Sequence, residues 1–175
     1  MFGLPPLRAL VFLAACAVPM ASVAVTADEA LPAPAEEPLL VVSGAITNTN
    51  VGDTATFDFD MLEALDTRTF TTKTIWTDGD QVFTGVQLSD LMELVGAEGT
   101  EIKATAINDY AVTIPSEDWV DGGPIVAFLN HGEKMPVRNK GPLWIVYPFD
   151  QKPEYQTEQI YSRAIWQLDR IIVLD

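Results

Sequence analysis

Alternating apolar and polar positions predict a chain built mainly from short strands. The clearest run is 68–77, where almost every residue is β-branched or aromatic and Phe70 and Trp76 fall on one face. The sequence Asp78-Gly79-Asp80 is typical of a turn, which predicts a hairpin with a second strand at 81–84. Further strands are expected at 39–42, 54–57, 101–107, 110–114, 125–129, 143–147 and 164–174.

The predicted helices are few and short. Asp58 is a candidate N-cap for a helix at 59–65, and Ser89 is a candidate N-cap for a helix at 90–95, which Gly96 would end. The other helical segments are expected as one turn after Ser116 and a short helix at 157–163. Strands and helices do not alternate regularly along the chain, so the pattern predicts an α+β fold with a mixed or antiparallel sheet.

Composition excludes several classes of function. The 25 acidic and 10 basic residues give a formal net charge of −15, the opposite of what binding to a nucleic-acid backbone requires. Hydrophobic residues make up 48% of the chain, too many for a disordered acidic tail. With one cysteine and one histidine, the chain can form neither an intrachain disulfide nor a zinc site of four cysteines or of two cysteines and two histidines.

The first 27 residues follow the plan of a secretory signal peptide. Arg8 is the only charge before Asp28, and the residues between them are mostly apolar, with small residues leading up to Ala27. We therefore expect a signal peptide at 1–27 and a secreted or periplasmic protein with no membrane span after cleavage. A retained membrane anchor is the alternative, because about 20 apolar residues suffice to cross a bilayer.

A second alternative is a lipoprotein. The sequence Leu13-Ala14-Ala15-Cys16 resembles a bacterial lipobox, in which Cys16 would carry the lipid and become the mature N-terminus. The segment after Cys16 stays apolar to Val25, whereas lipoprotein tethers are usually polar, and this favours simple secretion.

An acidic, proline-rich leader separates the signal from the domain. Residues 28–38 contain three prolines together with Glu36 and Glu37, which predicts a stiff, exposed segment. The remaining residues, 39–175, are enough for a single domain with its own core.

Candidate chemistry is concentrated in a basic segment. Lys134, Arg138 and Lys140 lie within seven residues, just after His131, the only histidine. Arginine grips carboxylate or phosphate with two hydrogen bonds, so the segment predicts an anion pocket. The alternative is that these cations only balance neighbouring acids on the surface. The sequence contains no Gly-x-Ser-x-Gly elbow, phosphate loop or dinucleotide fingerprint.

Aromatic residues form a second group near the C-terminus. Core packing is the expected role of Trp144 and Trp166, while the loop that follows Tyr147 is a candidate site because such loops often carry function. The whole group is Trp144, Tyr147, Phe149, Tyr155, Tyr161 and Trp166.

Several segments, in this order, resemble the sulfite-oxidase-like, molybdopterin-binding oxidoreductase domain. Residues 83–91 (FTGVQLSDL) look like its W/F-x-G-V-x-L-x-x-L segment, and 106–110 (AINDY) look like its A-x-D-G-Y turn. Residues 130–136 (NHGEKMP) and 141–148 (GPLWIVYP) are similar to its N-G-x-x-L and G-P-x-R-x-V-x-P stretches, and 166–173 (WQLDRIIV) to its last strand. The resemblance runs from about residue 40 to the end.

The resemblance implies an α+β domain of the sulfite-oxidase type whose relatives hold a molybdenum-pterin. There, one metal ligand is a cysteine thiolate located upstream of the G-V-x-L segment. Here the corresponding region, 70–82, contains no cysteine, and Cys16 lies in the signal. Threonine and serine oxygens are poor substitutes for a soft thiolate.

We therefore expect a secreted binding module that has lost molybdenum chemistry and binds no cofactor. Its partner would be a small anionic ligand or an envelope protein. The surface predicted to bind is Asn108, Asp109, Tyr110, His131, Lys134, Arg138 and Lys140, with the loop near Tyr147. The alternatives are a molybdopterin-dependent oxidoreductase with non-cysteine ligation, and an envelope lipoprotein with an interaction role.

Overall fold

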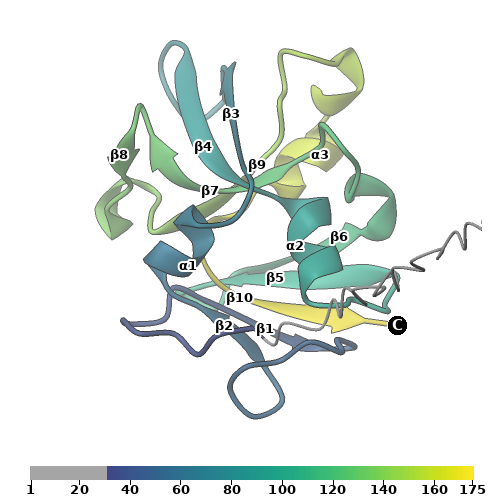
Figure 1. The fold of residues 1–175 in the computed structure, drawn as a ribbon. Helices are drawn as coiled ribbons and strands as arrows, with labels where there is room; N and C mark the ends of the chain where they lie inside the picture. The colour runs from purple at the N-terminus through teal and green to yellow at the C-terminus, as the bar shows by residue number, and fades with distance from the viewer. Residues whose placement is uncertain (1–30) are drawn as a thin grey trace, which may run out of the picture.

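The computed structural model describes residues 31–175, and the signal peptide and Cys16 lie outside this part of the chain. Ten strands form one mixed sheet that curls into a half-barrel (Figure 1). The main strand order is β2-β1-β10-β9-β7-β4-β3, with β5 on β10, β6 on β5 and β8 on β7. The strands are β1 (Leu40–Gly44), β2 (Ala55–Phe57), β3 (Thr67–Thr72), β4 (Gln81–Gln87), β5 (Glu101–Ala106), β6 (Ala111–Pro115), β7 (Ile125–Asn130), β8 (Glu133–Lys134), β9 (Leu143–Val146) and β10 (Trp166–Leu174).

The predicted α+β class is confirmed. β1 pairs with β10 in parallel, and the other strand pairs are antiparallel. The helices are α1 (Phe59–Glu63), α2 (Leu88–Leu94) and α3 (Glu158–Arg163), and the 3-10 turns are η1 (Ser116–Asp118), η2 (Val137–Asn139) and η3 (Pro153–Tyr155). No helix among residues 31–175 is long and apolar enough to cross a membrane.

The strand predicted at 68–77 is too long. β3 ends at Thr72, because Asp150 takes up the next polar groups: its carboxylate accepts a hydrogen bond from Lys73 N at 2.7 Å, and its own N–H donates to the Thr72 hydroxyl at 3.1 Å. The chain then leaves the sheet, and a 2.7 Å bond between the Thr74 and Thr77 hydroxyls closes a turn around Trp76.

The two predicted N-caps have different outcomes. Asp58 caps α1 as expected, and its carboxylate accepts from Met61 N at 2.9 Å. Ser89 is not a cap, because α2 already begins at Leu88. The Ser89 hydroxyl instead accepts a hydrogen bond from the Gln87 side chain.

The described part of the leader is held against the domain. Asp58 also accepts from Ala35 N at 2.8 Å and Glu36 N at 3.0 Å, and the Asn50 amide donates to Pro32 O at 2.7 Å. Leu31 packs against the core. Most side chains of residues 31–36 are exposed, as expected for the leader, while these hydrogen bonds hold its backbone against the domain.

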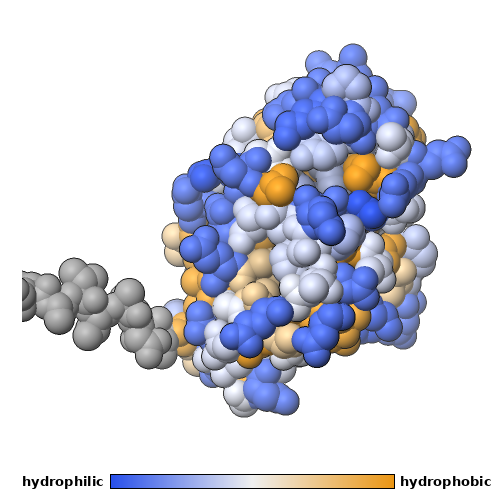
Figure 2. Space-filling model, turned by 90° about the vertical axis from the view of Figure 1, so that its right-hand side faces the viewer, coloured by the Kyte–Doolittle hydropathy of each residue, from blue (hydrophilic) through white to orange (hydrophobic). Residues whose placement is uncertain are grey.

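The core fills the concave side of the sheet. Its largest fully buried side chains are Trp144, Tyr147, Phe57, Phe83, Phe128 and Phe149. The face in Figure 2 is largely hydrophilic with scattered apolar residues, as the acidic composition predicts.

Candidate functional site

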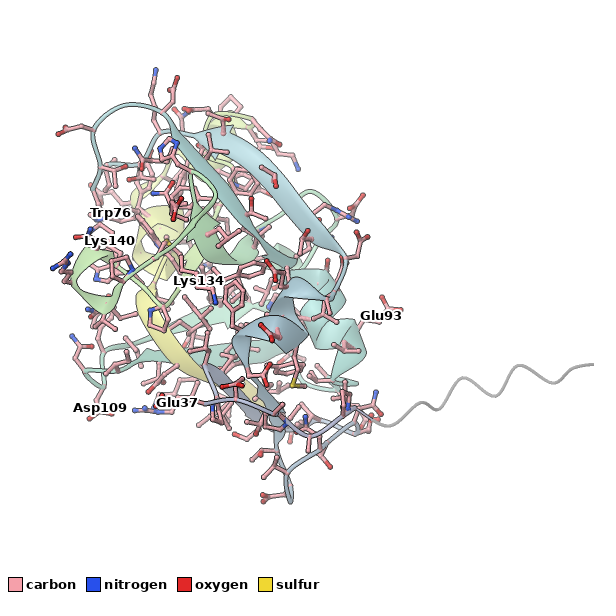
Figure 3. The ribbon with its side chains drawn as sticks, turned by 60° about the vertical axis from the view of Figure 1, so that its left-hand side comes forward. Glu37, Trp76, Glu93, Asp109, Lys134 and Lys140 are labelled. Carbon is pink, nitrogen blue, oxygen red and sulfur yellow. The ribbon has the colours of Figure 1, made fainter. Side chains whose placement is uncertain are left out.

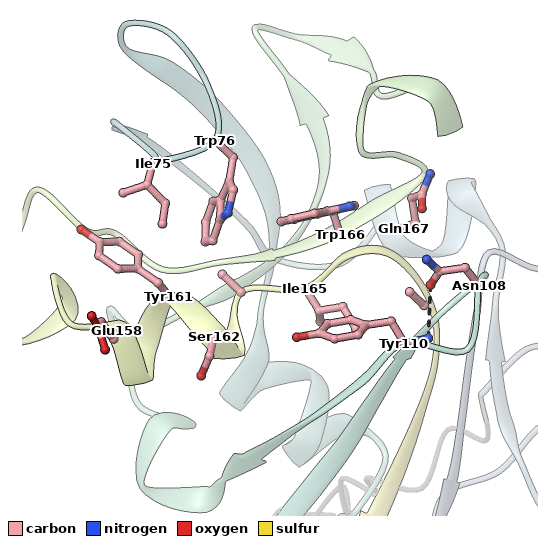
Figure 4. Close-up of a pocket in the computed structure, with 12 residues that line it drawn as sticks. Ile75, Trp76, Asn108, Tyr110, Glu158, Tyr161, Ser162, Ile165, Trp166 and Gln167 are labelled. Atoms are coloured by element: carbon pink, nitrogen blue, oxygen red, sulfur yellow. Dashed lines mark hydrogen bonds between the residues drawn. The ribbon is translucent and has the colours of Figure 1, made fainter.

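An open pocket of about 550 Å³ lies where four segments meet, and we call it the aromatic pocket (Figure 4). The segments are the β3–β4 loop, the β5–β6 turn, α3 and the start of β10. The lining residues are Ile75, Trp76, Ala106, Asn108, Tyr110, Glu158, Tyr161, Ser162, Ala164, Ile165, Trp166 and Gln167.

Trp76 is the central wall of the aromatic pocket. Its ring centroid lies 5.4 Å from that of Trp166 and 5.9 Å from that of Tyr161, with interplanar angles of 66° and 89°. Edge-to-face contacts of this kind stabilise aromatic clusters beyond the burial of their area. The three rings therefore support one another and leave parts of their surfaces for a ligand.

Tyr110 forms the opposite side of the aromatic pocket and is held by a tight turn. The Asn108 side-chain oxygen accepts from Tyr110 N at 3.2 Å, Asp109 adopts a φ of 66°, and the Asp109 carboxylate pairs with Arg170. Asn and Asp tolerate such turns because their side chains bond to nearby backbone. Tyr110 is 58% exposed and Ile75 is 63% exposed, so both present free apolar surface.

A largely buried ion pair fixes α3, which carries Tyr161 and Glu158. Arg163 Nη1 donates to both Asp118 carboxylate oxygens, at 3.0 and 2.8 Å, and the Tyr147 hydroxyl donates to Asp118 Oδ2 at 2.7 Å. The Asp118 and Arg163 side chains are only 12% and 16% exposed. Burial and the bond to Asp118 raise the pKa of Tyr147 far above its usual value, so this hydroxyl stays protonated and donates.

A bulge at the start of β10 completes the aromatic pocket. Gln167 has a φ of 55°, and the strand pairing shifts between Trp166 and Leu168. The Gln167 amide donates to Val137 O at 2.8 Å. Bulges change the direction of side chains at sheet edges and next to sites, which explains how Trp166 and Gln167 can both line the pocket.

The residues predicted to form one binding surface lie in different parts of the structure. Asn108 and Tyr110 line the aromatic pocket, whereas Asp109 beside them is engaged by Arg170. Tyr147 is fully buried in the core, so its predicted place on the surface is wrong. The loop after it contributes Asp150, which shapes the β3–β4 loop as described above.

The basic residues do not converge. Within the segment 131–140, which we call the basic loop, Lys134 Nζ lies 3.4 Å from the centroid of the Phe59 ring and Lys140 Nζ lies 4.2 Å from that of Trp166 (Figure 3). His131 occupies the exposed turn between β7 and β8, and Arg138 is exposed on η2. Two of these cations thus face aromatic rings, and the anion pocket expected from the sequence stays a prediction.

Of the twelve lining residues, the predicted binding surface included only Asn108 and Tyr110. Ile75 and Trp76 had been placed in a continuous strand, and Glu158, Ser162, Ile165 and Gln167 had drawn no attention. A signal was present for Trp76: the six residues 72–77 include three threonines, whose hydroxyls can bond to nearby backbone and so compete with a strand.

The residues present do not fit a thiolate-ligated molybdenum-pterin. The region that the resemblance equates with the metal-binding cysteine is the β3–β4 loop, where the hydroxyls of Thr72, Thr74 and Thr77 already form internal hydrogen bonds. No cysteine occurs in residues 31–175, and this part of the chain contains no cluster of His, Cys, Asp or Glu that could hold a metal ion.

Comparison with solved structures identifies the architecture. The domain is similar to the sulfane dehydrogenase SoxCD from Paracoccus pantotrophus, with a TM-score of 0.58 and 19% identity over 78% of this chain. This chain shares the fold of the aligned part of that structure. The expected fold, a mixed sheet with short helices, is confirmed by this match, and at this identity the match shows the fold alone.

The structural match covers only part of the SoxCD chain, and comparisons of sequence found no match. The aligned part covers 38% of the SoxCD chain. No family model matches this sequence, and no curated protein matches it. The aromatic pocket must therefore be interpreted from its own residues.

Proposed function

We propose that this protein is a ligand-binding module that uses the aromatic pocket and carries out no molybdenum redox chemistry. One observation carries the proposal. The β3–β4 loop and the 106–110 turn, which the resemblance relates to the cofactor side of the oxidoreductase domain, both line the pocket, yet its lining contains aromatic rings and no thiolate. The fold resembles that of the oxidoreductase, but the pocket contains no cysteine that could bind the metal.

The dimensions and chemistry of the pocket support binding of a small molecule. Its volume of about 550 Å³ lies within the range of pockets that enclose drug-sized ligands, and such pockets are mostly apolar with a few polar groups. The exposed surfaces of Ile75 and Tyr110 would be buried by a ligand, which provides a hydrophobic driving force.

The first test separates binding from redox catalysis. The full chain is purified natively from a host that makes the molybdenum cofactor and is studied by elemental analysis and native mass spectrometry. We expect no stoichiometric molybdenum. One molybdenum atom per chain would overturn the proposal and favour an oxidoreductase with non-cysteine ligation.

The second test locates binding. A small-molecule library is screened for compounds that raise the melting temperature of the wild-type chain, and each hit is repeated with Tyr110→Ser. Val51→Ser is the matched control, because Val51 is 46% exposed and does not line the pocket. The proposal expects hits that Tyr110→Ser weakens and Val51→Ser leaves unchanged. Hits insensitive to Tyr110→Ser would move the site elsewhere.

We further propose that the module works outside the cytoplasm after removal of residues 1–27. The support is the charge and apolar pattern of the sequence. Mass spectrometry of the mature chain should give an N-terminus at Asp28. Incorporation of a labelled fatty acid that Cys16→Ser abolishes would contradict this and establish the lipoprotein alternative.

A further inference from the structure

We infer that the aromatic pocket selects an organic cation, a free small molecule with a quaternary or tertiary ammonium group on an apolar body. This inference rests on the proposed function and adds the chemical class of the ligand. Three features of the pocket support it: its charge, the arrangement of its rings and the engagement of its neutral polar groups.

The charge of the lining has one sign. Glu158 is the only charged residue among the twelve that line the pocket, which contain no Lys, Arg or His. Glu158 forms no ion pair among the residues that the structure describes, so its carboxylate is available to a cationic ligand. The net charge of −15 adds a long-range attraction for cations and a repulsion for anions.

The nearest basic side chains have other partners. Arg163, on α3, is held by Asp118 as described above. Lys140 Nζ lies 4.2 Å from the centroid of Trp166, a wall residue, in a cation–π contact. Lys134 over Phe59 and Lys152 over Tyr155 repeat the same contact elsewhere in the chain.

The aromatic rings are oriented as in a cage. Trp76 stands at 66° to Trp166 and at 89° to Tyr161, so the rings bound the pocket from different directions, with Tyr110 across from them (Figure 4). Aromatic faces carry negative quadrupole charge, and cages of such rings recognise quaternary ammonium groups.

Three neutral polar side chains of the lining each have one group in an internal hydrogen bond. Ser162 donates to Gln159 O at 2.7 Å, the Gln167 amide donates to Val137 O, and the Asn108 oxygen accepts from Tyr110 N. An ammonium group needs none of them, because the aromatic faces and the Glu158 carboxylate supply its contacts.

The test compares ligands of equal shape and different charge. Binding of benzyltrimethylammonium, its uncharged isostere neopentylbenzene and the anion benzenesulfonate is measured with the full chain by calorimetry or tryptophan fluorescence at 0.15 M salt. We expect the cation to bind about tenfold more tightly than the isostere. Glu158→Gln should weaken cation binding severalfold. Glu93→Gln is the matched control, because it removes the same charge from α2, away from Trp76 (Figure 3).

The outcomes distinguish failure of the inferred ligand class from failure of the proposed binding function. Equal binding of the cation and the isostere, or preference for benzenesulfonate, would overturn the charge selection and leave the proposed binding function standing. If Glu158→Gln and Glu93→Gln weakened cation binding equally, the weakening would come from the change in net charge alone, and the inference would be overturned. Failure of all three probes to bind would count against both the inference and the proposed function.

Discussion

The basic loop and the aromatic pocket differ in how their residues come together. The basic loop has its cations within ten consecutive residues, yet Lys134 lies over Phe59 and Lys140 over Trp166. The aromatic pocket draws its walls from positions between Ile75 and Gln167, and the sheet brings them to one place. Neighbours in sequence therefore need not share a site, whereas topology can build one from distant residues.

The two regions also differ in what holds them in place. The pocket is anchored by polar contacts, with Asp118 and Arg163 behind α3 and Asp150 behind the β3–β4 loop. The basic loop is anchored by close packing at Gly141, where an added side chain would meet the Met135 carbonyl. Substitutions at the two anchors should therefore have effects that can be told apart.

The largest effect is expected at the anchor of the pocket. Asp118→Ala should lower the free energy of unfolding by about 3 kcal/mol, because it leaves the Arg163 charge buried without a partner. Urea unfolding measures the loss, and binding of benzyltrimethylammonium should weaken with it. Tyr147→Phe, which removes one hydrogen bond, should cost only about 1 kcal/mol. A loss below about 1 kcal/mol for Asp118→Ala would show that the pair behaves as an exposed one.

The next effect should fall mainly on the basic loop, which contacts the pocket through Trp166 and Gln167. Gly141→Ala places a Cβ against the Met135 carbonyl oxygen, and relief of this overlap should cost about 2 kcal/mol in urea unfolding. Asn139→Ala, two residues earlier and exposed, serves as the near-neutral control. If Gly141→Ala abolished binding to the pocket while the protein remained folded, the two regions would not be independent.

A smaller effect tests what Lys134 does. Lys134→Met removes the cation over Phe59 and should cost about 0.5 kcal/mol, while Lys103→Met on β5 should cost less. Melting temperatures measured with and without phosphate complete the test. A phosphate-dependent stabilisation that Lys134→Met removes would restore the anion pocket predicted from the sequence.

The smallest effect is expected at Asp58, the N-cap of α1, which does not line the aromatic pocket. Hydrogen bonds from the backbone of Met61, Glu36 and Ala35 hold the pKa of Asp58 below its usual value of 3.8. Asp58 therefore stabilises the fold above about pH 4, and this contribution is lost as the pH falls through the folded-state pKa. Asp58→Asn retains one acceptor oxygen, so the variant should be slightly less stable at pH 7. The difference should disappear in strong acid; a difference independent of pH would contradict this explanation.

Much of the fold could be predicted from local patterns. Alternation located most strands, and Asp58 was identified as a cap from its position before an apolar helix face. The prediction for 68–77 failed beyond Thr72 because the Asp150 contact that ends β3 comes from 78 residues later in the chain. Ser89 failed as a cap because α2 starts one residue earlier, directly after β4.

The candidate site was less predictable for a physical reason. Asn108 and Tyr110 were found because their turn has a recognisable sequence, and the turn forms locally. Trp76 reaches the pocket only because its loop folds over Tyr161 and Trp166, which lie more than 80 residues away. Tyr147 was misplaced because a buried tyrosine that bonds to an acid has the same sequence pattern as an exposed one.

The most direct test of the account is to follow the indole N–H signals of the four tryptophans by NMR while benzyltrimethylammonium is added to the full chain. Two of them, Trp76 and Trp166, line the aromatic pocket, whereas Trp119 does not. The account predicts that the Trp76 signal shifts on saturation while those of Trp119 and of the His131 amide stay in place. Shifts at His131 and along the basic loop with an unmoved Trp76 signal would contradict it.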